Sequence, residues 1–71
     1  MGIMRIRELR KEAGLTQVSL GVQLGMTQSI VSDWENEVYL PKARDLPLLA
    51  RVLRCEINDL FVREGKELEV S

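Results

Sequence analysis

Histidine is absent from this chain of 71 residues, which has one cysteine, two prolines and one each of tryptophan, tyrosine and phenylalanine. A single cysteine, Cys55, excludes an intrachain disulfide, and without histidine it leaves no credible structural zinc site. There is also no Gly-rich phosphate loop, no Cys–His pair and no recognisable pair of carboxylates. We therefore expect no enzymatic activity, no metal, no cofactor and no small-molecule ligand.

Long apolar runs are also missing, since none approaches the roughly 20 residues that span a bilayer. We expect no membrane partner and a cytoplasmic location. The composition, with 45% hydrophobic and 30% charged residues, is typical of a globular protein, and the length allows one domain. We expect that domain over residues 1–62, followed by a tail over residues 63–71 that is either flexible or a short strand associated with a dimer.

Positive charge is scarce as well, because the formal net charge is −1 and the sequence pI is about 5.4. Residues 1–55 hold eight basic and six acidic side chains, whereas residues 56–71 hold two basic and five acidic ones. The acidity is thus concentrated near the C-terminus. A balance this close to neutral is not a strong electrostatic signal for a nucleic-acid partner.

Helical periodicity dominates what remains, and strand alternation is nearly absent. Ile6, Leu9, Arg10 and Ala13 share one face of a first helix, which Gly14 ends. This pattern predicts an all-α domain.

A second helix begins after Thr16, a residue favoured as an N-cap, and buries Leu20 and Leu24. Gly21 leaves room on it for a close approach by another helix, and Gly25 ends it. A third helix follows almost at once, so the two must turn sharply, which is the geometry of a helix-turn-helix.

The third helix is expected from about Gln28 to Asn36, capped by Thr27, with Val31 and Trp34 facing inward. We expect Trp34 to pack in the core, with base stacking as the alternative. The opposite face carries four short or planar polar side chains: Gln28, Ser29, Ser32 and Asp33. Beyond it we expect a fourth helix from Ala43 to about Arg54 and a short fifth one holding Ile57, Leu60 and Phe61.

Several of these residues together resemble the Cro/C1-type, or XRE-like, helix-turn-helix family of transcriptional regulators. The residues that carry the resemblance are Leu15-Thr16-Gln17, Leu20, Leu24-Gly25, Val31 and Trp34-Glu35-Asn36, within a similarity that extends from about Arg5 to Phe61. The resemblance implies a compact five-helix, lambda-repressor-like DNA-binding domain. Such a domain docks its third helix in the major groove, commonly as a dimer on a palindromic operator.

The outer face of the third helix is then the candidate base-contacting surface. Gln28 can bond adenine through two atoms, Ser29 and Ser32 can donate or accept, and Asp33 can accept from cytosine. The alternative is that these four residues form an ordinary solvated face. Asp33 is unusual, because the family often has Arg or Lys there.

Four residues are candidates for contacts with DNA phosphates: Gln17, Asn36, Lys42 and Arg44. Gln17 begins the second helix, whose N-terminus favours phosphate, and the family places a backbone contact at Asn36. The alternatives are a helical position of no special role for Gln17 and a left-handed helix C-cap for Asn36. The family usually has Gly where Glu37 stands, so the following loop is expected to be built differently.

The resemblance also implies a structural ion pair between Arg10 and Glu35, which would fix the presentation of the third helix. The alternative is two separate solvated charges.

Two functions remain open. The first is a sequence-specific regulator of transcription that binds double-stranded DNA, a repressor acting as a homodimer through its C-terminal helix (Leu60, Phe61) and tail (Leu68, Val70). The second is a protein-interaction or antitoxin-like module on the same fold with weak DNA binding, using an exposed apolar patch of Val18, Val22 and Ile30.

Overall fold

The computed structural model describes residues 3–62, and within this range all regular elements are helical. Three α-helices, α1 (Ile6–Glu12), α2 (Gln17–Leu24) and α3 (Gln28–Glu35), are followed by a 3-10 turn, η1 (Ala43–Asp45). Helix α4 (Leu46–Leu53) and a second 3-10 helix, η2 (Ile57–Leu60), complete the domain. The expected all-α fold is confirmed. The proposed tail lies outside the described residues.

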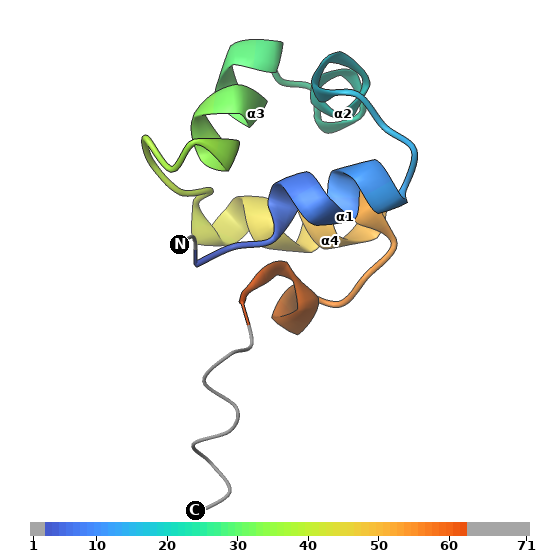
Figure 1. Cartoon of the computed structure of the whole chain (residues 1–71), viewed down its shortest axis with the longest axis vertical. Helices are drawn as coiled ribbons and strands as arrows, with labels where there is room; N and C mark the ends of the chain where they lie inside the picture. Colours follow the sequence, from blue (N-terminus) through green and yellow to red (C-terminus); the bar gives the residue numbers. More distant parts are fainter. Residues whose placement is uncertain (1–2, 63–71) are drawn as a thin grey trace, which may run out of the picture.

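The elements enclose one core, with α1 and α4 lying between the α2–α3 pair and η2 (Figure 1). Each helix contributes the inward face that its periodicity predicts. The buried apolar side chains are Ile6, Leu9, Leu20, Leu24, Val31, Trp34, Leu49, Ala50, Leu53 and Leu60. Trp34 is among them, so its ring packs in the core. None of the helices over residues 3–62 is long and apolar enough to cross a membrane.

The N-terminal arm is fastened to the end of the domain by backbone hydrogen bonds. Arg5 N–H donates to the Leu60 carbonyl at 2.7 Å, and Val62 N–H donates to the Ile3 carbonyl at 2.9 Å. Met4 and Phe61 form an isolated antiparallel bridge between these contacts. The first and last described segments therefore close the fold together.

The structure refines two expectations for the C-terminal half. The fourth helix does not begin as α-helix at Ala43, because residues 43–45 form a 3-10 turn and Pro47 then occupies the first turn of α4. The fifth helix is a four-residue 3-10 helix. Leu60 is fully buried, so it belongs to the core rather than to a surface available to a partner.

Candidate nucleic-acid interface

The turn between α2 and α3 depends on residues that tolerate special backbone geometry. Gly25 caps α2 with φ +73°, a left-handed conformation that costs glycine little. A Cβ at Gly21 would lie 3.0 Å from the carbonyl oxygen of Met26. The close neighbour of Gly21 is thus the backbone of the turn, where we expected another helix. Thr27 then caps α3 by accepting a hydrogen bond from Ile30 N–H at 3.3 Å.

The outer face of α3 holds the four candidate base-contacting residues. Gln28 and Ser29, in its first turn, are exposed, whereas Ser32 and Asp33 are half-buried. Val31 and Trp34 anchor the opposite face in the core. The most exposed of these polar side chains therefore lie at the N-terminal end of α3.

A single carboxylate, that of Glu35, connects α3 to both α1 and α2. Arg10 donates to it from Nε at 2.5 Å and from Nη2 at 3.1 Å, and Gln17 Nε2 donates at 3.1 Å. The Glu35 side chain is fully shielded from solvent, and that of Arg10 is only 10% exposed. The structure thus joins Arg10 and Glu35 in a shielded ion pair, and the two are not separate solvated charges.

This network changes the acidity of Glu35. Burial raises the pKa of its carboxyl group, but the hydrogen bonds from Arg10, Gln17 and Arg7 outweigh burial and leave the pKa below its ordinary value. The hydrogen bond to Glu35 likewise raises the pKa of Arg10. Both groups therefore stay charged near neutral pH, and the ion pair at the junction of the three helices is intact there.

Gln17 is engaged on both sides. While its Nε2 donates to Glu35, its Oε1 accepts a hydrogen bond from Gln28 Nε2 at 3.2 Å. Gln28 is thereby tied, through Gln17, to the shielded carboxylate behind it. A side chain held in this way has fewer conformations to lose when it binds.

Asn36 follows the last residue of α3 and is exposed. Its Nδ2 donates to Ser32 Oγ at 3.3 Å, and its Oδ1 accepts from Arg7 Nη2 at 3.3 Å. Its φ of −91° excludes the left-handed cap that was the alternative for this residue. Glu37 adopts that conformation with φ 59°, so the backbone turns there as it would with Gly, contrary to expectation. The Glu37 carboxylate accepts a hydrogen bond from Ile3 N–H at 2.9 Å.

Arg7 is the functional candidate that the sequence analysis missed. It lies on α1 and donates both to Glu35 Oε1, at 3.2 Å, and to Asn36. The sequence did indicate the position of Arg7 through its spacing from Arg10, because residues three positions apart on a helix share one face. The structure places Lys42 and Arg44 away from this network, exposed before and within η1.

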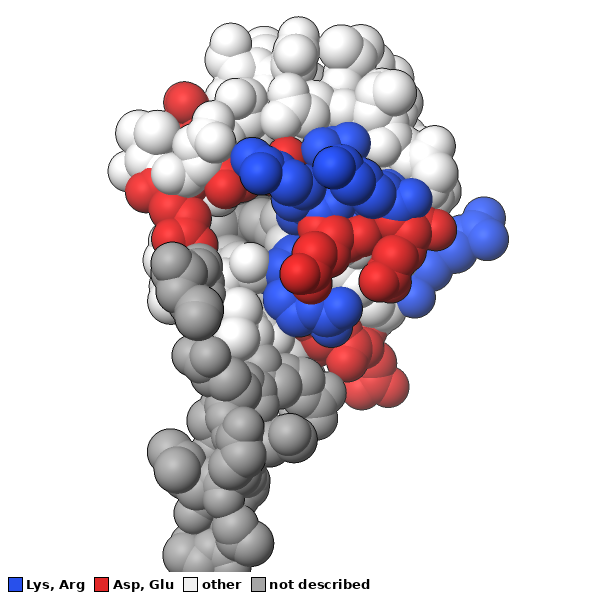
Figure 2. Space-filling model, viewed as in Figure 1, with Lys and Arg blue, Asp and Glu red and all other residues white. Residues whose placement is uncertain are grey.

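Charge is unevenly distributed around the site. Residues 15–41 contain no lysine or arginine, so α2 and α3 carry none. Figure 2 shows a largely uncharged surface over α2 and α3, with basic side chains gathered over α1 beside it. Any positive charge near α3 must therefore come from neighbouring elements, α1 above all.

The structure thus has a short turn between two helices, in which a glycine caps the first helix and Val31 and Trp34 anchor the second. The chain matches the helix-turn-helix family model over residues 6–60. The chain belongs to the helix-turn-helix family. The resemblance to Cro/C1-type regulators is thus confirmed.

Several known proteins are similar to this one over most of the chain. An uncharacterised HTH-type transcriptional regulator of Archaeoglobus fulgidus is 36% identical over 90% of this chain and 91% of its own length. The ImmF control region 10 kDa protein of Bacillus phage phi105 is 34% identical over 90% of this chain and 71% of its own length. The crystal structure of the P22 c2 repressor in complex with synthetic operator 9T superimposes with a TM-score of 0.74, at 30% identity, covering 82% of this chain and 91% of that one.

Proposed function

We propose that this helix-turn-helix protein is a sequence-specific regulator of transcription that binds double-stranded DNA through the outer face of α3. The observation that carries the proposal is the fixed presentation of that face: Glu35 joins α3 to α1 and α2, and Gln17 holds Gln28 from behind. A recognition helix needs such an anchor, because its exposed side chains must reach base edges in one orientation. The similar P22 c2 repressor was crystallised with an operator, which supports the same role here.

In this proposal Gln28 is the principal base contact. It lies at the exposed N-terminal end of α3, and its amide can pair with both N6 and N7 of adenine. Ser29 has the same exposure and adds a donor or acceptor. Ser32 and Asp33 are half-buried, so less of each side chain is available to bases; Ser32 can donate or accept, and Asp33 can accept from cytosine.

The proposed phosphate contacts flank this face. We expect the first-turn amides of α2 and the exposed Asn36 at the end of α3 to bind phosphates on either side of a groove-bound helix. To bind phosphate, the Gln17 side chain would either give up its hydrogen bond with Glu35 or use the second N–H of its amide group. Lys42 and Arg44, exposed around η1, supply further positive charge.

We further propose that the protein represses transcription in the cytoplasm as a homodimer on a palindromic operator. One recognition helix covers only a few base pairs, and two copies about 34 Å apart read successive turns of one duplex face. Since Leu60 is buried, the apolar candidates for the dimer surface become Leu48, Ile57 and Phe61, which are exposed on α4 and around η2. Sedimentation at tens of micromolar tests this proposal: a dimer supports it, and a monomer contradicts it.

The decisive experiment for DNA binding is a selection from random-sequence duplexes at low and moderate salt. The proposal expects enrichment of one palindromic motif, and an affinity that falls steeply with salt as counterions are released. Recovery of no enriched sequence contradicts it.

A protein-interaction or antitoxin-like module is the second candidate function. The observation in its favour is apolar exposure on α2, where Val22 is 72% and Val18 is 54% exposed. Ile30 does not belong to that patch, because it is half-buried and packs against the core. If this second function is correct, the duplex selection recovers no enriched sequence. A protein partner is then expected, whose binding shields Val18 and Val22 from solvent.

A further inference from the structure

Two guanidinium groups serve one carboxylate at the junction of α1 and α3. Arg10 and Arg7 both donate to Glu35, which leaves the cluster with one positive charge in excess. The two arginines differ in exposure: the Arg10 side chain is 10% exposed and that of Arg7 is 52% exposed. The excess charge therefore reaches solvent through Arg7, while Arg10 alone already makes two hydrogen bonds to Glu35.

Arg7 also lies at the end of the proposed reading helix. Its Nη2 donates to Asn36 Oδ1. A surface hollow between α1 and the C-terminal end of α3 has polar lining from Arg5, Arg7, Asn36 and the carboxylates of Glu8, Glu35 and Glu37. Glu8 and Glu35 are paired with arginines, and Glu37 accepts from Ile3 N–H. A guanidinium has five N–H donors in a fixed fork, and among residues 3–62 two of those of Arg7 are engaged. Donors remain for an oxygen acceptor entering beside Asn36.

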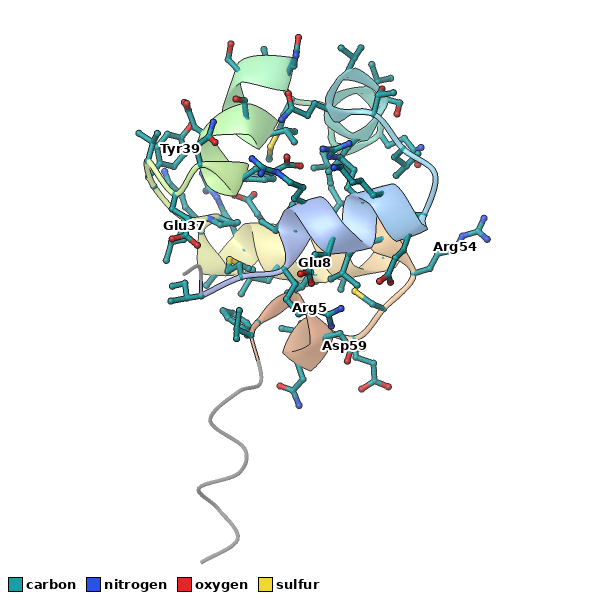
Figure 3. All side chains as sticks on the ribbon, in the orientation of Figure 1. Arg5, Glu8, Glu37, Tyr39, Arg54 and Asp59 are labelled. Carbon is teal, nitrogen blue, oxygen red and sulfur yellow. The ribbon has the colours of Figure 1, made fainter. Side chains whose placement is uncertain are left out.

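The neighbouring charged residues distinguish Arg7 from Arg5, the residue just before α1. Arg5 pairs with Glu8 at 2.9 Å and approaches Glu12 at 4.0 Å, and Figure 3 shows Arg5 and Glu8 beside each other, so the charge of Arg5 is offset by its neighbours. Within residues 3–62, Arg7 and Arg10 both donate to Glu35 at the end of α3, and of the two Arg7 is the exposed one.

We propose that Arg7 is a further DNA-binding residue, which orients Asn36 and binds a backbone phosphate of the duplex at the C-terminal end of α3. This inference rests on the proposed DNA-binding function. It supplies the positive charge that α3 lacks, and planar guanidinium is well suited to phosphate oxygens. A phosphate contact adds affinity for every sequence and does not change which bases are preferred.

The test measures binding to a pool of random-sequence duplexes across a KCl titration for the wild type and three variants. Arg7→Gln should lower the affinity and reduce the magnitude of the log–log salt slope by about 0.9, the value of one phosphate. Arg7→Lys keeps the charge and should keep the slope. Arg54→Asn is the matched control, because it removes one positive charge at the end of α4, where Figure 3 shows the side chain pointing away from α3. Asn also tolerates the left-handed backbone of that residue.

The outcomes separate this inference from the proposed function. A slope reduced in Arg7→Gln alone supports it. A wild type that binds with a slope unchanged by Arg7→Gln, or equally reduced by Arg54→Asn, overturns the role of Arg7 and leaves DNA binding intact. A slope reduced in Arg7→Lys also overturns it. If Arg7→Gln folds poorly, Arg7→Lys still tests the proposal, because it keeps the positive charge near Glu35. A wild type that binds no duplex at low salt overturns both proposals.

Discussion

At the scale of single residues, Glu35 determines how α3 is held. Its carboxylate accepts hydrogen bonds from two helices other than its own, through Arg10 and Arg7 of α1 and Gln17 of α2. A buried charge of this kind adds little net stability compared with an apolar replacement, yet it fixes one relative orientation of the elements it joins. The position and angle of the reading face therefore depend on it.

Removal of this carboxylate should be costly. Glu35→Ala leaves Arg10 shielded without its partner and close to a second arginine, so we expect a loss of about 3–5 kcal/mol in the free energy of unfolding, measured with urea. Glu8→Ala is the matched control, because that carboxylate also pairs with an arginine but is 66% exposed. It should change stability by no more than about 1 kcal/mol. Equal losses in the free energy of unfolding of the two variants would contradict the account in which Glu35 holds α1, α2 and α3 together.

The residue scale also shows where sequence reasoning stops. The pairing of Arg10 with Glu35 was implied by family resemblance, and the exposure of Gln28 and Ser29 followed from periodicity. The contact of Arg7 with Asn36 joins residues 29 positions apart and depends on the angle at which α1 crosses α3. Local patterns of spacing do not determine that angle, so Arg7 could be placed on the right face but not beside its partner.

At the scale of elements, the tight turn between α2 and α3 sets the geometry of the motif. Met26 N–H donates to the Gly21 carbonyl at 2.8 Å, so the backbone of the turn lies directly against Gly21. There is no side chain in this contact that could rotate away. The size of residue 21 is therefore limited by backbone atoms.

Enlarging residue 21 should distort this turn. Gly21→Val places a branched side chain against the backbone of Met26 and Thr27, and we expect a loss of about 1–3 kcal/mol in thermal or urea unfolding. Gly21→Ala should change stability by less than about 1 kcal/mol, because the gain in helix propensity offsets the close contact. Val22→Ala, at an exposed neighbouring position, is the control. A valine variant as stable as the alanine variant would contradict this account of the turn.

The elements themselves were predictable to different degrees. The bounds of α1 to α3 follow closely from capping residues and glycines, because these act through local hydrogen bonds and backbone preference. The last segment was predicted as a short helix, and it is a 3-10 helix whose end is held by bonds from Arg5 N–H to the Leu60 carbonyl and from Val62 N–H to the Ile3 carbonyl. Glu37 adopts a backbone conformation that favours Gly, and its carboxylate bond to Ile3 N–H helps to offset that strain. Both outcomes depend on contacts with the N-terminal arm, which lies far away in sequence.

At the scale of the whole molecule, stability should depend on pH through Glu35. Its pKa is lower in the folded state than in the unfolded chain, so its contribution is present above the unfolded value of about 4.3 and is lost as pH falls through the folded pKa. Urea unfolding between neutral and acidic pH should show this loss, and Glu35→Gln should reduce it. Glu12→Gln, at an exposed carboxylate, should retain it. An identical pH dependence in wild type and Glu35→Gln would contradict the assignment.

The whole molecule also explains how a nearly neutral chain can be proposed to bind DNA. The proposed reading face of α3 supplies hydrogen-bonding groups without positive charge, and basic side chains gather beside it over α1, with acidic ones among them (Figure 2). In the proposed function, base preference and electrostatic attraction are thus carried by different elements. Substitutions in α3 should alter which sequence is bound, whereas loss of charge from α1 should weaken binding to all sequences.

The most direct test of the central claim, that the outer face of α3 reads base pairs, is the random-duplex selection repeated with Gln28→Ala. The account predicts that the wild type enriches a palindrome and that the variant loses base preference at one symmetry-related pair of positions while the rest of the motif is kept. Each lost contact of this type is worth about 1–3 kcal/mol of discrimination. An enriched motif that is identical for the wild type and Gln28→Ala would contradict the claim.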